Sequence, residues 1–160
     1  IVECMEKAGW DSMDLDEVVI TDGPGSYTGV RIAMTVAKVL CTRLHLPLYT
    51  ISTLQLYAGL DEEALVLMDA RSHRAYVGIL EEGRFLRKPC AMPLAEIEQL
   101  AAQGSYHYYG DAQLIGKSAL PSDYLDNFIA LRPCYQRVEN IHTLTPAYLK
   151  DQSAYQVKTR

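Results

Sequence analysis

Residues 18–40 read VVITDGPGSYTGVRIAMTVAKVL, and this stretch decides the fold. It joins a β-branched run, Val18 to Ile20, to a glycine-rich segment from Gly23 to Gly29 and then to a long apolar run. A β-branched run predicts a strand, glycine and proline predict a turn, and Thr28 is a suitable residue to cap a helix. We therefore predict a strand, a glycine loop and a helix over residues 30–44, in that order.

The pattern of strands and helices continues on both sides of this stretch. Ile1, Val2, Met5 and Ala8 have the spacing of an amphipathic helix that ends at Gly9. Alternating or β-branched runs predict further strands, and longer periodic runs predict helices. The expected strands are Leu48–Ser52, Ala64–Met68, Ala75–Leu80, Arg84–Arg87 and Tyr106–Tyr109, and the expected helices cover residues 54–59 and 94–102.

This order of elements predicts an α/β fold. At 160 residues with 49% hydrophobic composition, the chain can bury one moderate core or two small lobes. The segment from Pro89 to Pro93 is the expected boundary, which gives a lobe over residues 1–92 and a smaller lobe over residues 93–160. The region before Thr145 is expected to be irregular.

The glycine loop is a candidate anion site, because backbone N–H groups and a helix N-terminus meet there. A P-loop requires a lysine directly after its last glycine, whereas Val30 follows Gly29. The dinucleotide fingerprint also fails, because the third glycine comes one residue late. The loop is either structural, with glycines that provide unusual dihedral angles, or anion-binding. Its candidate residues are Gly23, Pro24, Gly25, Ser26, Tyr27, Thr28, Gly29 and Arg31.

The helix predicted at residues 30–44 has little polar surface. Its polar residues Arg31, Thr35, Lys38 and Thr42 fall on one narrow stripe. An ordinary surface helix is polar over about half its circumference, so this helix is predicted to be covered on two sides. Either the opening helix or a partner protein provides the second cover. The candidate partner-binding residues are Val2, Met5, Val36, Val39 and Leu40.

Composition narrows the classes of function. The net charge of −5 disfavours a large phosphate-binding surface, so any RNA substrate is expected to be held by another subunit. Cys4, Cys41, Cys90 and Cys134 lie far apart, which predicts reduced thiols in or near a core. No run is long and apolar enough to span a membrane, and we expect a cytoplasmic protein.

Sequence patterns that are typical of catalytic sites are weak in this chain. The four histidines are scattered without a second histidine at i+4, so no metal site is predicted, and Ser26 lacks a nucleophile elbow. The rival hypothesis is a metal-dependent nuclease or phosphotransferase, because Asp22, Asp69 and Asp111 each follow a predicted strand and carboxylates can bind magnesium. In the alternative for Asp69, its carboxylate caps its own turn or pairs with nearby arginines.

Four stretches, in the same order along the chain, resemble the TsaB family, which is also called YeaZ. They are residues 18–40, PLYTISTLQLYA at 47–58, ALVLMDARSHRAYVGIL at 64–80 and LTPAYLKDQSA at 144–154. The resemblance implies actin-like, ribonuclease-H-like lobes of the ASKHA superfamily, to which a peptidase M22-like label is often attached. The sequence departs from the family pattern in two places. The opening strands are absent before Ile1, so ATP binding is not expected, and the helix before the Pro-x-Tyr-Leu ending is missing between Pro133 and Leu144.

The same resemblance implies a function without catalysis or a cofactor. Members of the family pair through their first two helices with TsaD, the catalytic paralogue, and they work with TsaE, an ATPase. The assembly transfers a threonylcarbamoyl group to the tRNA adenosine beside the anticodon, so the subunit itself meets tRNA only indirectly. Members also form homodimers through the same helices.

Overall fold

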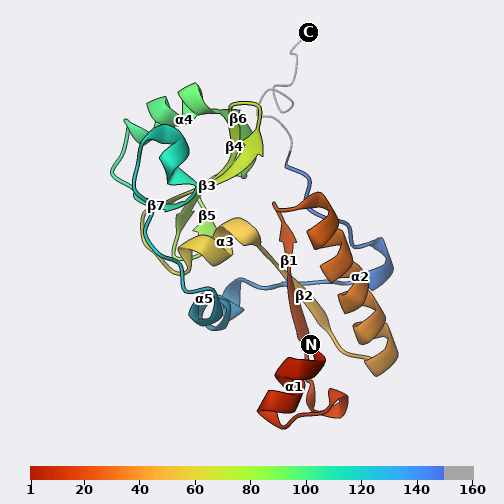
Figure 1. The fold of residues 1–160 in the computed structure, drawn as a ribbon. Helices are drawn as coiled ribbons and strands as arrows, with labels where there is room; N and C mark the ends of the chain where they lie inside the picture. Colours follow the sequence, from red (N-terminus) through yellow and green to blue (C-terminus); the bar gives the residue numbers. More distant parts are fainter. Residues whose placement is uncertain (150–160) are drawn as a thin grey trace.

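The computed structural model describes residues 1–149, which form two β-sheets with helices packed on them (Figure 1). The first sheet has the strand order β1-β2-β8, with β1 parallel to β2 and β8 antiparallel to β2. Parallel neighbours require a crossover connection, and α2 provides it. The bounds of these elements are Val18–Gly23 for β1, Tyr27–Leu44 for α2, Leu48–Ser52 for β2 and Gln136–Arg137 for β8.

The second sheet has the order β5-β4-β3-β7, with β6 paired to β4. Its strands β3 and β4 are antiparallel and form the long central hairpin, whereas β7 runs parallel to β3. The strands cover Ala64–Arg71 (β3), Arg74–Glu81 (β4), Arg84–Phe85 (β5), Cys90–Pro93 (β6) and His107–Gly110 (β7).

The helices cover both faces of the second sheet. Along β3, Leu65 and Leu67 pack into the cluster that contains α4, and Ala64 and Val66 pack into the cluster that contains α3. Alternate residues of a strand point to opposite faces of the sheet, so this pattern is expected for a strand that is buried on both faces. The helices are α1 (Val2–Ala8), α3 (Thr53–Ala58), α4 (Leu94–Ala101) and α5 (Tyr124–Ala130), with short 3₁₀ turns at Ser12–Asp14, Ala112–Ile115, Arg132–Cys134 and Ile141–Thr143.

The predicted α/β class and most predicted elements are confirmed, with four differences. Strand β6 was not predicted, because its segment was expected to be a lobe boundary. Helix α2 begins at Tyr27 with Ser26 as its cap, so the prediction of Thr28 as the cap is wrong. Helix α5 and strand β8 lie in the region that was expected to be irregular. The cap of α5 is Asp123, whose carboxylate accepts hydrogen bonds from the backbone N–H groups of Leu125 and Asp126.

The sheets divide the chain differently from the expected lobes. The boundary expected at residues 92 and 93 falls at the end of β6, which pairs with β4 of the preceding part. Strand β8 then returns to the first sheet. The division into residues 1–92 and 93–160 stays a prediction, and residues 150–160 lie outside the described part of the chain.

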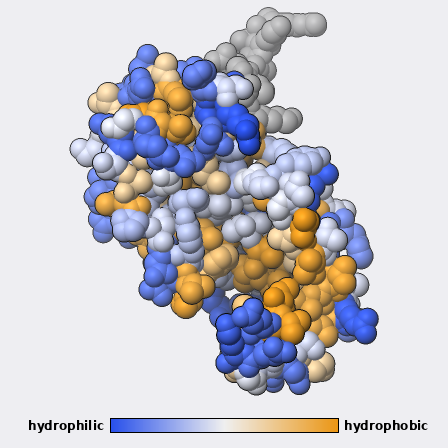
Figure 2. Space-filling view, in the orientation of Figure 1, coloured by the Kyte–Doolittle hydropathy of each residue, from blue (hydrophilic) through white to orange (hydrophobic). Residues whose placement is uncertain are grey.

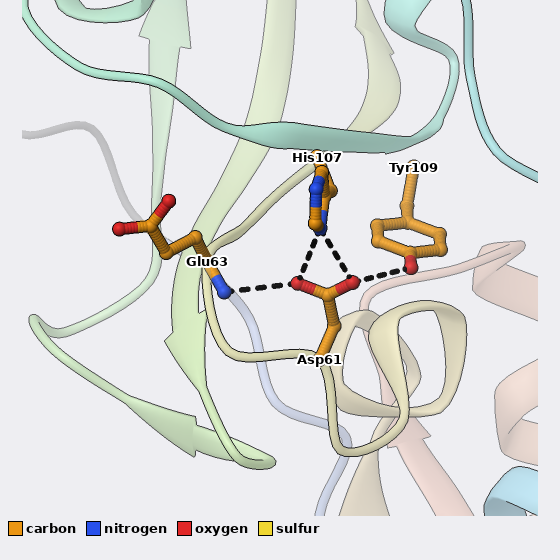
Figure 3. Close-up of polar contacts among 4 residues, drawn as sticks. All are labelled: Asp61, Glu63, His107 and Tyr109. Carbon is orange, nitrogen blue, oxygen red and sulfur yellow. Dashed lines mark hydrogen bonds and ion pairs between the residues drawn. The ribbon is translucent and has the colours of Figure 1, made fainter.

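The carboxylate of Asp61 connects the loop before β3 to strand β7 (Figure 3). It accepts hydrogen bonds from the hydroxyl of Tyr109 at 2.8 Å and from the backbone N–H of Glu63 at 2.9 Å. Nδ1 of His107 lies 2.9 Å from Oδ2 of the same carboxylate. Burial favours the protonated form of Asp61, but the hydrogen bonds outweigh it and lower the pKa. Burial and the bond to Asp61 also raise the pKa of Tyr109 to about 12.

We predict that Asp61→Ala lowers the free energy of unfolding by about 2–3 kcal/mol at neutral pH, because hydrogen bonds to a charged group are lost together. The pKa of Asp61 is lower in the folded state, so its stabilisation is present above the ordinary value of 3.8 and is lost as the pH falls further. Urea unfolding of the variant and of Glu62→Ala, an exposed neighbour, measures this. Equal stability of the two variants at pH 7 would contradict the role given to Asp61.

Candidate functional site

The glycine loop is shorter than its sequence suggests, because Tyr27, Thr28 and Gly29 already belong to α2. Oγ of Ser26 accepts a hydrogen bond from the backbone N–H of Gly29 at 3.3 Å, which caps the helix. Within this loop only Gly23 has a left-handed backbone, with φ of 119°. The hypothesis that the glycines provide unusual dihedral angles therefore holds at Gly23 and is wrong for Gly25 and Gly29.

Helix α2 presents three different sides. Met34, Ala37 and Cys41 are buried, and the core around them contains Val18 and Leu48 of the first sheet. The polar stripe predicted from the sequence contacts the segment that follows β8. There Nη2 of Arg31 donates to the hydroxyl of Tyr148 at 2.6 Å, and Nζ of Lys38 donates to the carbonyl of Leu144 at 2.7 Å.

The third side of α2 is apolar and open. Val36 is 44% exposed and Val39 is 62% exposed, so the opening helix does not cover this side. Instead a groove of about 600 Å³ separates α1 from α2 and β1. Figure 2 shows hydrophobic surface gathered over α2 and β1, above the largely hydrophilic α1. We call this the apolar groove, and it is lined by Ile1, Cys4, Met5, Leu15, Glu17, Val18, Val19, Ile20, Ala33, Val36, Ala37 and Leu40.

The structure brings together three of the five predicted partner-binding residues. Met5, Val36 and Leu40 line the apolar groove. Val2, which is 70% exposed, and Val39 lie outside its lining. Cys4 is exposed on the same groove, so the prediction that all four thiols lie in or near a core is wrong for this one.

Asp22 stands at an irregular position in the first sheet. Thr21 pairs with Ile51 and Gly23 pairs with Ser52, so Asp22 has no partner residue in β2. Its Oδ1 is buried and has no hydrogen-bond partner within residues 1–149. Burial raises the pKa of Asp22 to about 6, although its own backbone N–H favours the ionised form.

The three aspartates of the rival hypothesis do not converge. One carboxylate oxygen of Asp111 accepts a hydrogen bond from the backbone N–H of Asp69 at 2.8 Å. The carboxylate of Asp69 caps its own turn by accepting from the backbone N–H of Arg71 at 2.7 Å. Within residues 1–149, no three histidine, cysteine or acidic side chains are grouped so that they could hold a metal ion. The prediction that Asp22 joins Asp69 and Asp111 in a magnesium site is therefore wrong.

Comparison with known proteins identifies the family to which this architecture belongs. Residues 1–125 match the family model described as "TsaD: tRNA N6-adenosine threonylcarbamoyltransferase". The chain belongs to this family. Two of the curated relatives that it resembles are TsaB proteins, so the predicted resemblance to the TsaB group is confirmed. In the part of the chain that the structure describes, no helix is long and apolar enough to cross a membrane.

Two TsaB proteins named for tRNA threonylcarbamoyladenosine biosynthesis are similar in sequence. The Bacillus subtilis protein is 40% identical over 72 residues, which is 42% of this chain and 31% of that protein. The protein of Buchnera aphidicola subsp. Schizaphis graminum is 34% identical over 71 residues, which is 41% of this chain and 34% of that protein. The chain thus spans about a third of the length of these relatives.

Two solved structures from Pseudomonas aeruginosa share the fold. An uncharacterized protein with similarity to peptidase YEAZ superposes with a TM-score of 0.72 at 23% identity, over 92% of this chain and 80% of that chain. YeaZ superposes with a TM-score of 0.68 at 21% identity, over 92% of this chain and 81% of that chain. Together with the match to the TsaD family, these structures confirm the predicted ASKHA-type fold.

Sequence reasoning missed the contacts that join distant parts of the chain. Arg31 and Tyr148 are separated by 117 residues, and a single sequence gives no signal that pairs them. Arg84 of β5 and Asp22 of β1 line one cleft between the two sheets, and the sequence places them in unrelated elements. The hairpin predicted around Gly83 gave the position of Arg84 along the chain but not the surface that it lines.

We predict opposite effects for two glycine substitutions. Gly23→Ala places a side chain at φ of 119°, a region that costs about 1–3 kcal/mol, and should lower the melting temperature. In Gly29→Ala the new Cβ meets Ser26 at an ordinary contact of 3.4 Å within a helix, where alanine is favoured over glycine by about 0.5–1 kcal/mol. Thermal melts should show a loss for the first variant and none for the second; the reverse order would contradict the loop geometry.

We also predict that Asp22→Asn stabilises the protein at pH 7 to 8. The folded-state pKa is raised from 3.8 to about 6, so the ionised carboxylate opposes folding, and this penalty develops as the pH rises between those values. Melting temperatures of the variant and the parent should therefore differ above pH 6 and converge near pH 4. Asp16→Asn, an exposed control, should show no such pH dependence. A constant difference across this range would show that Asp22 titrates normally.

Proposed function

We propose that the chain acts as the TsaB-type, non-catalytic subunit that pairs with a TsaD-type catalytic paralogue in threonylcarbamoyl transfer to tRNA. The observation that carries the proposal is the apolar groove. It opens beside the exposed side chains of Val36 and Val39, and an apolar surface of this kind is rarely left in water by a monomer.

The family supports a paralogue as the occupant. The match to the TsaD family over residues 1–125 indicates that this chain and a TsaD protein share one ancestral architecture. Related subunits can pair by placing equivalent surfaces against each other, as identical subunits do around a twofold axis. Helices α1 and α2 would then meet the corresponding helices of the partner in a four-helix arrangement. A second copy of this chain would use the same surface when the paralogue is absent.

The charge of the chain supports an indirect relation to tRNA. With a net charge of −5, it has an excess of acidic groups and lacks the cation surplus that binds phosphates. In this proposal the catalytic paralogue holds the tRNA, a TsaE-type ATPase completes the assembly, and the present chain supplies neither metal nor cofactor. A cytoplasmic location follows from the same proposal. The glycine loop then acts as the structural turn that sets the start of α2.

The proposal predicts that a charge in the apolar groove prevents pairing without unfolding the chain. Met5→Glu and Val36→Glu should each give a folded protein, because neither side chain is buried. Burying a carboxylate in an apolar interface costs several kcal/mol, so binding to the TsaD protein of the same organism should weaken more than tenfold. Calorimetric titration measures this, and light scattering shows whether the copies also separate.

The matched control is Ile129→Glu on α5, where the isoleucine is 76% exposed and lies outside the apolar groove. This variant should bind the TsaD protein as the parent does. Full binding by folded forms of both Met5→Glu and Val36→Glu would show that the paralogue docks elsewhere. Loss of binding by Ile129→Glu as well would point to a different or wider interface.

A further inference from the structure

A second recess, separate from the apolar groove, lies between the two sheets. This inter-sheet cleft has a volume of about 580 Å³, within the range of roughly 300–1,000 Å³ that is usual for small-molecule sites. Its lining comes from β1, β2, α3, β5 and β8 and from the segments on either side of β8. The residues that matter for its chemistry are Asp22, Ser52, Gln55, Arg84 and Phe85.

Two neutral polar side chains of the cleft, Ser52 and Gln55, already form hydrogen bonds. Nε2 of Gln55 donates to the carbonyl of Gly83 at 2.7 Å, and its Oε1 accepts from the backbone N–H of Ser52 at 3.1 Å. The hydroxyl of Ser52 donates to the carbonyl of Gly23 at 3.0 Å. These bonds tie the first sheet to the β4–β5 hairpin, so they form a rigid frame around the cleft.

Within residues 1–149, the two charged groups that line the cleft form no ion pair, and one oxygen of the Asp22 carboxylate lacks a hydrogen-bond partner. Among the described residues that line it, only Asp22 and Arg84 carry a formal charge. Oδ1 of Asp22 has no hydrogen-bond partner, and Arg84 forms no ion pair within residues 1–149. The two groups lie on different sheets and do not pair with each other. The cleft therefore presents one acceptor and one cation, held apart.

A ligand that satisfies both groups must carry an anion and a hydrogen-bond donor in one small molecule. A carboxylate is the natural partner of a guanidinium, which can donate two parallel hydrogen bonds to it. An ammonium or hydroxyl group is the matching donor for the carboxylate of Asp22. We propose that the inter-sheet cleft is a binding site for a small zwitterionic carboxylic acid of the α-amino acid class, held between Asp22 and Arg84.

The conformation of β1 fits this role. Asp22 has no partner residue in β2, and such irregularities redirect a side chain away from regular pairing. The segment after β8 contacts β1 at the same residue, because the backbone N–H of Ala147 donates to the carbonyl of Asp22 at 2.9 Å. Oδ1 of the Asp22 carboxylate is buried, and the residue lines the cleft. A donor supplied by the ligand would offset the cost of burying that group.

The test is an NMR titration of the full chain with L-threonine and L-alanine, in which the amide chemical shifts report binding. Acetate and ethylammonium are the single-ended probes, since each can satisfy only one of the two charges. We expect saturable shifts around the cleft with both amino acids and binding at least about tenfold weaker with either single-ended probe. Asp22→Asn and Arg84→Gln should each weaken amino acid binding by about tenfold or more.

Matched controls separate this effect from a general change in charge. Asp16→Asn and Arg43→Gln remove the same charges at exposed positions outside the cleft, and they should leave the affinity within about twofold. Both Asp22→Asn and Arg84→Gln should keep the parent's affinity for the TsaD protein, because neither residue lines the apolar groove. If the cleft does not bind amino acids, the proposed pairing with TsaD is unaffected. If the chain does not bind TsaD, the proposed amino acid site is likewise unaffected.

The pH dependence gives a further readout. The ammonium end prefers ionised Asp22, so affinity should fall as the pH decreases through about 6, and Asp22→Asn should abolish that dependence. The other titratable groups that line this cleft and the adjoining cavity are Arg84, Cys134, Tyr27, Tyr76 and Tyr148. The proposal is overturned if neither amino acid gives saturable shifts, if both cleft variants bind like the parent, or if acetate alone binds as tightly as L-threonine.

Discussion

The parallel pairing of β1 with β2 is the constraint on which the rest of the structure depends. Parallel strands cannot be joined by a tight turn, so the chain must cross over through α2, and α2 must lie on the sheet. Met34, Ala37 and Cys41 supply the buried side that this packing requires. The remaining apolar side of α2 then has no cover within the described chain, and it becomes one wall of the apolar groove.

The same crossover sets the geometry at the end of β1. The chain must leave the sheet and enter α2 within a few residues, and it does so through the left-handed Gly23 and the capping hydroxyl of Ser26. The irregular pairing just before this turn separates Asp22 from β2 and leaves its carboxylate at the edge of the inter-sheet cleft. A structural turn and a candidate ligand site thus share one short segment, of which the glycine and proline pattern predicted the turn but not the ligand site.

Much of the fold could be predicted because it depends on local sequence patterns. The run of β-branched residues in β1, the periodicity of α2 and the β4–β5 hairpin each depend on neighbours in sequence. The cap of α2 was misplaced by two residues because Ser26 and Thr28 can both cap a helix, and Tyr27 gives little local preference. Helix α5 was missed although Asp123 is a good cap, because Leu125 and Ile129 stay exposed. The contacts of Tyr124 and Asn127 that join the helix to α3 are long-range, and no local pattern predicts them.

The candidate sites were predicted less completely, for a physical reason. The apolar side of α2 follows from periodicity, so Val36 and Leu40 could be named from the sequence. Which side would remain open depends on what the distant segment around Tyr148 covers, and that is a long-range contact. The role of Asp22 depends on the register of β1 against β2, which no single-sequence pattern contains.

Hydrogen–deuterium exchange of the chain, alone and with the TsaD protein of the same organism, tests the central claim most directly. The proposed partner occupies the apolar groove, so exchange should slow in α1, β1 and the open side of α2 when the partner is added. The second sheet and α5 should exchange as before. Protection confined to α5 or to the second sheet, with α1 and α2 unchanged, would contradict it.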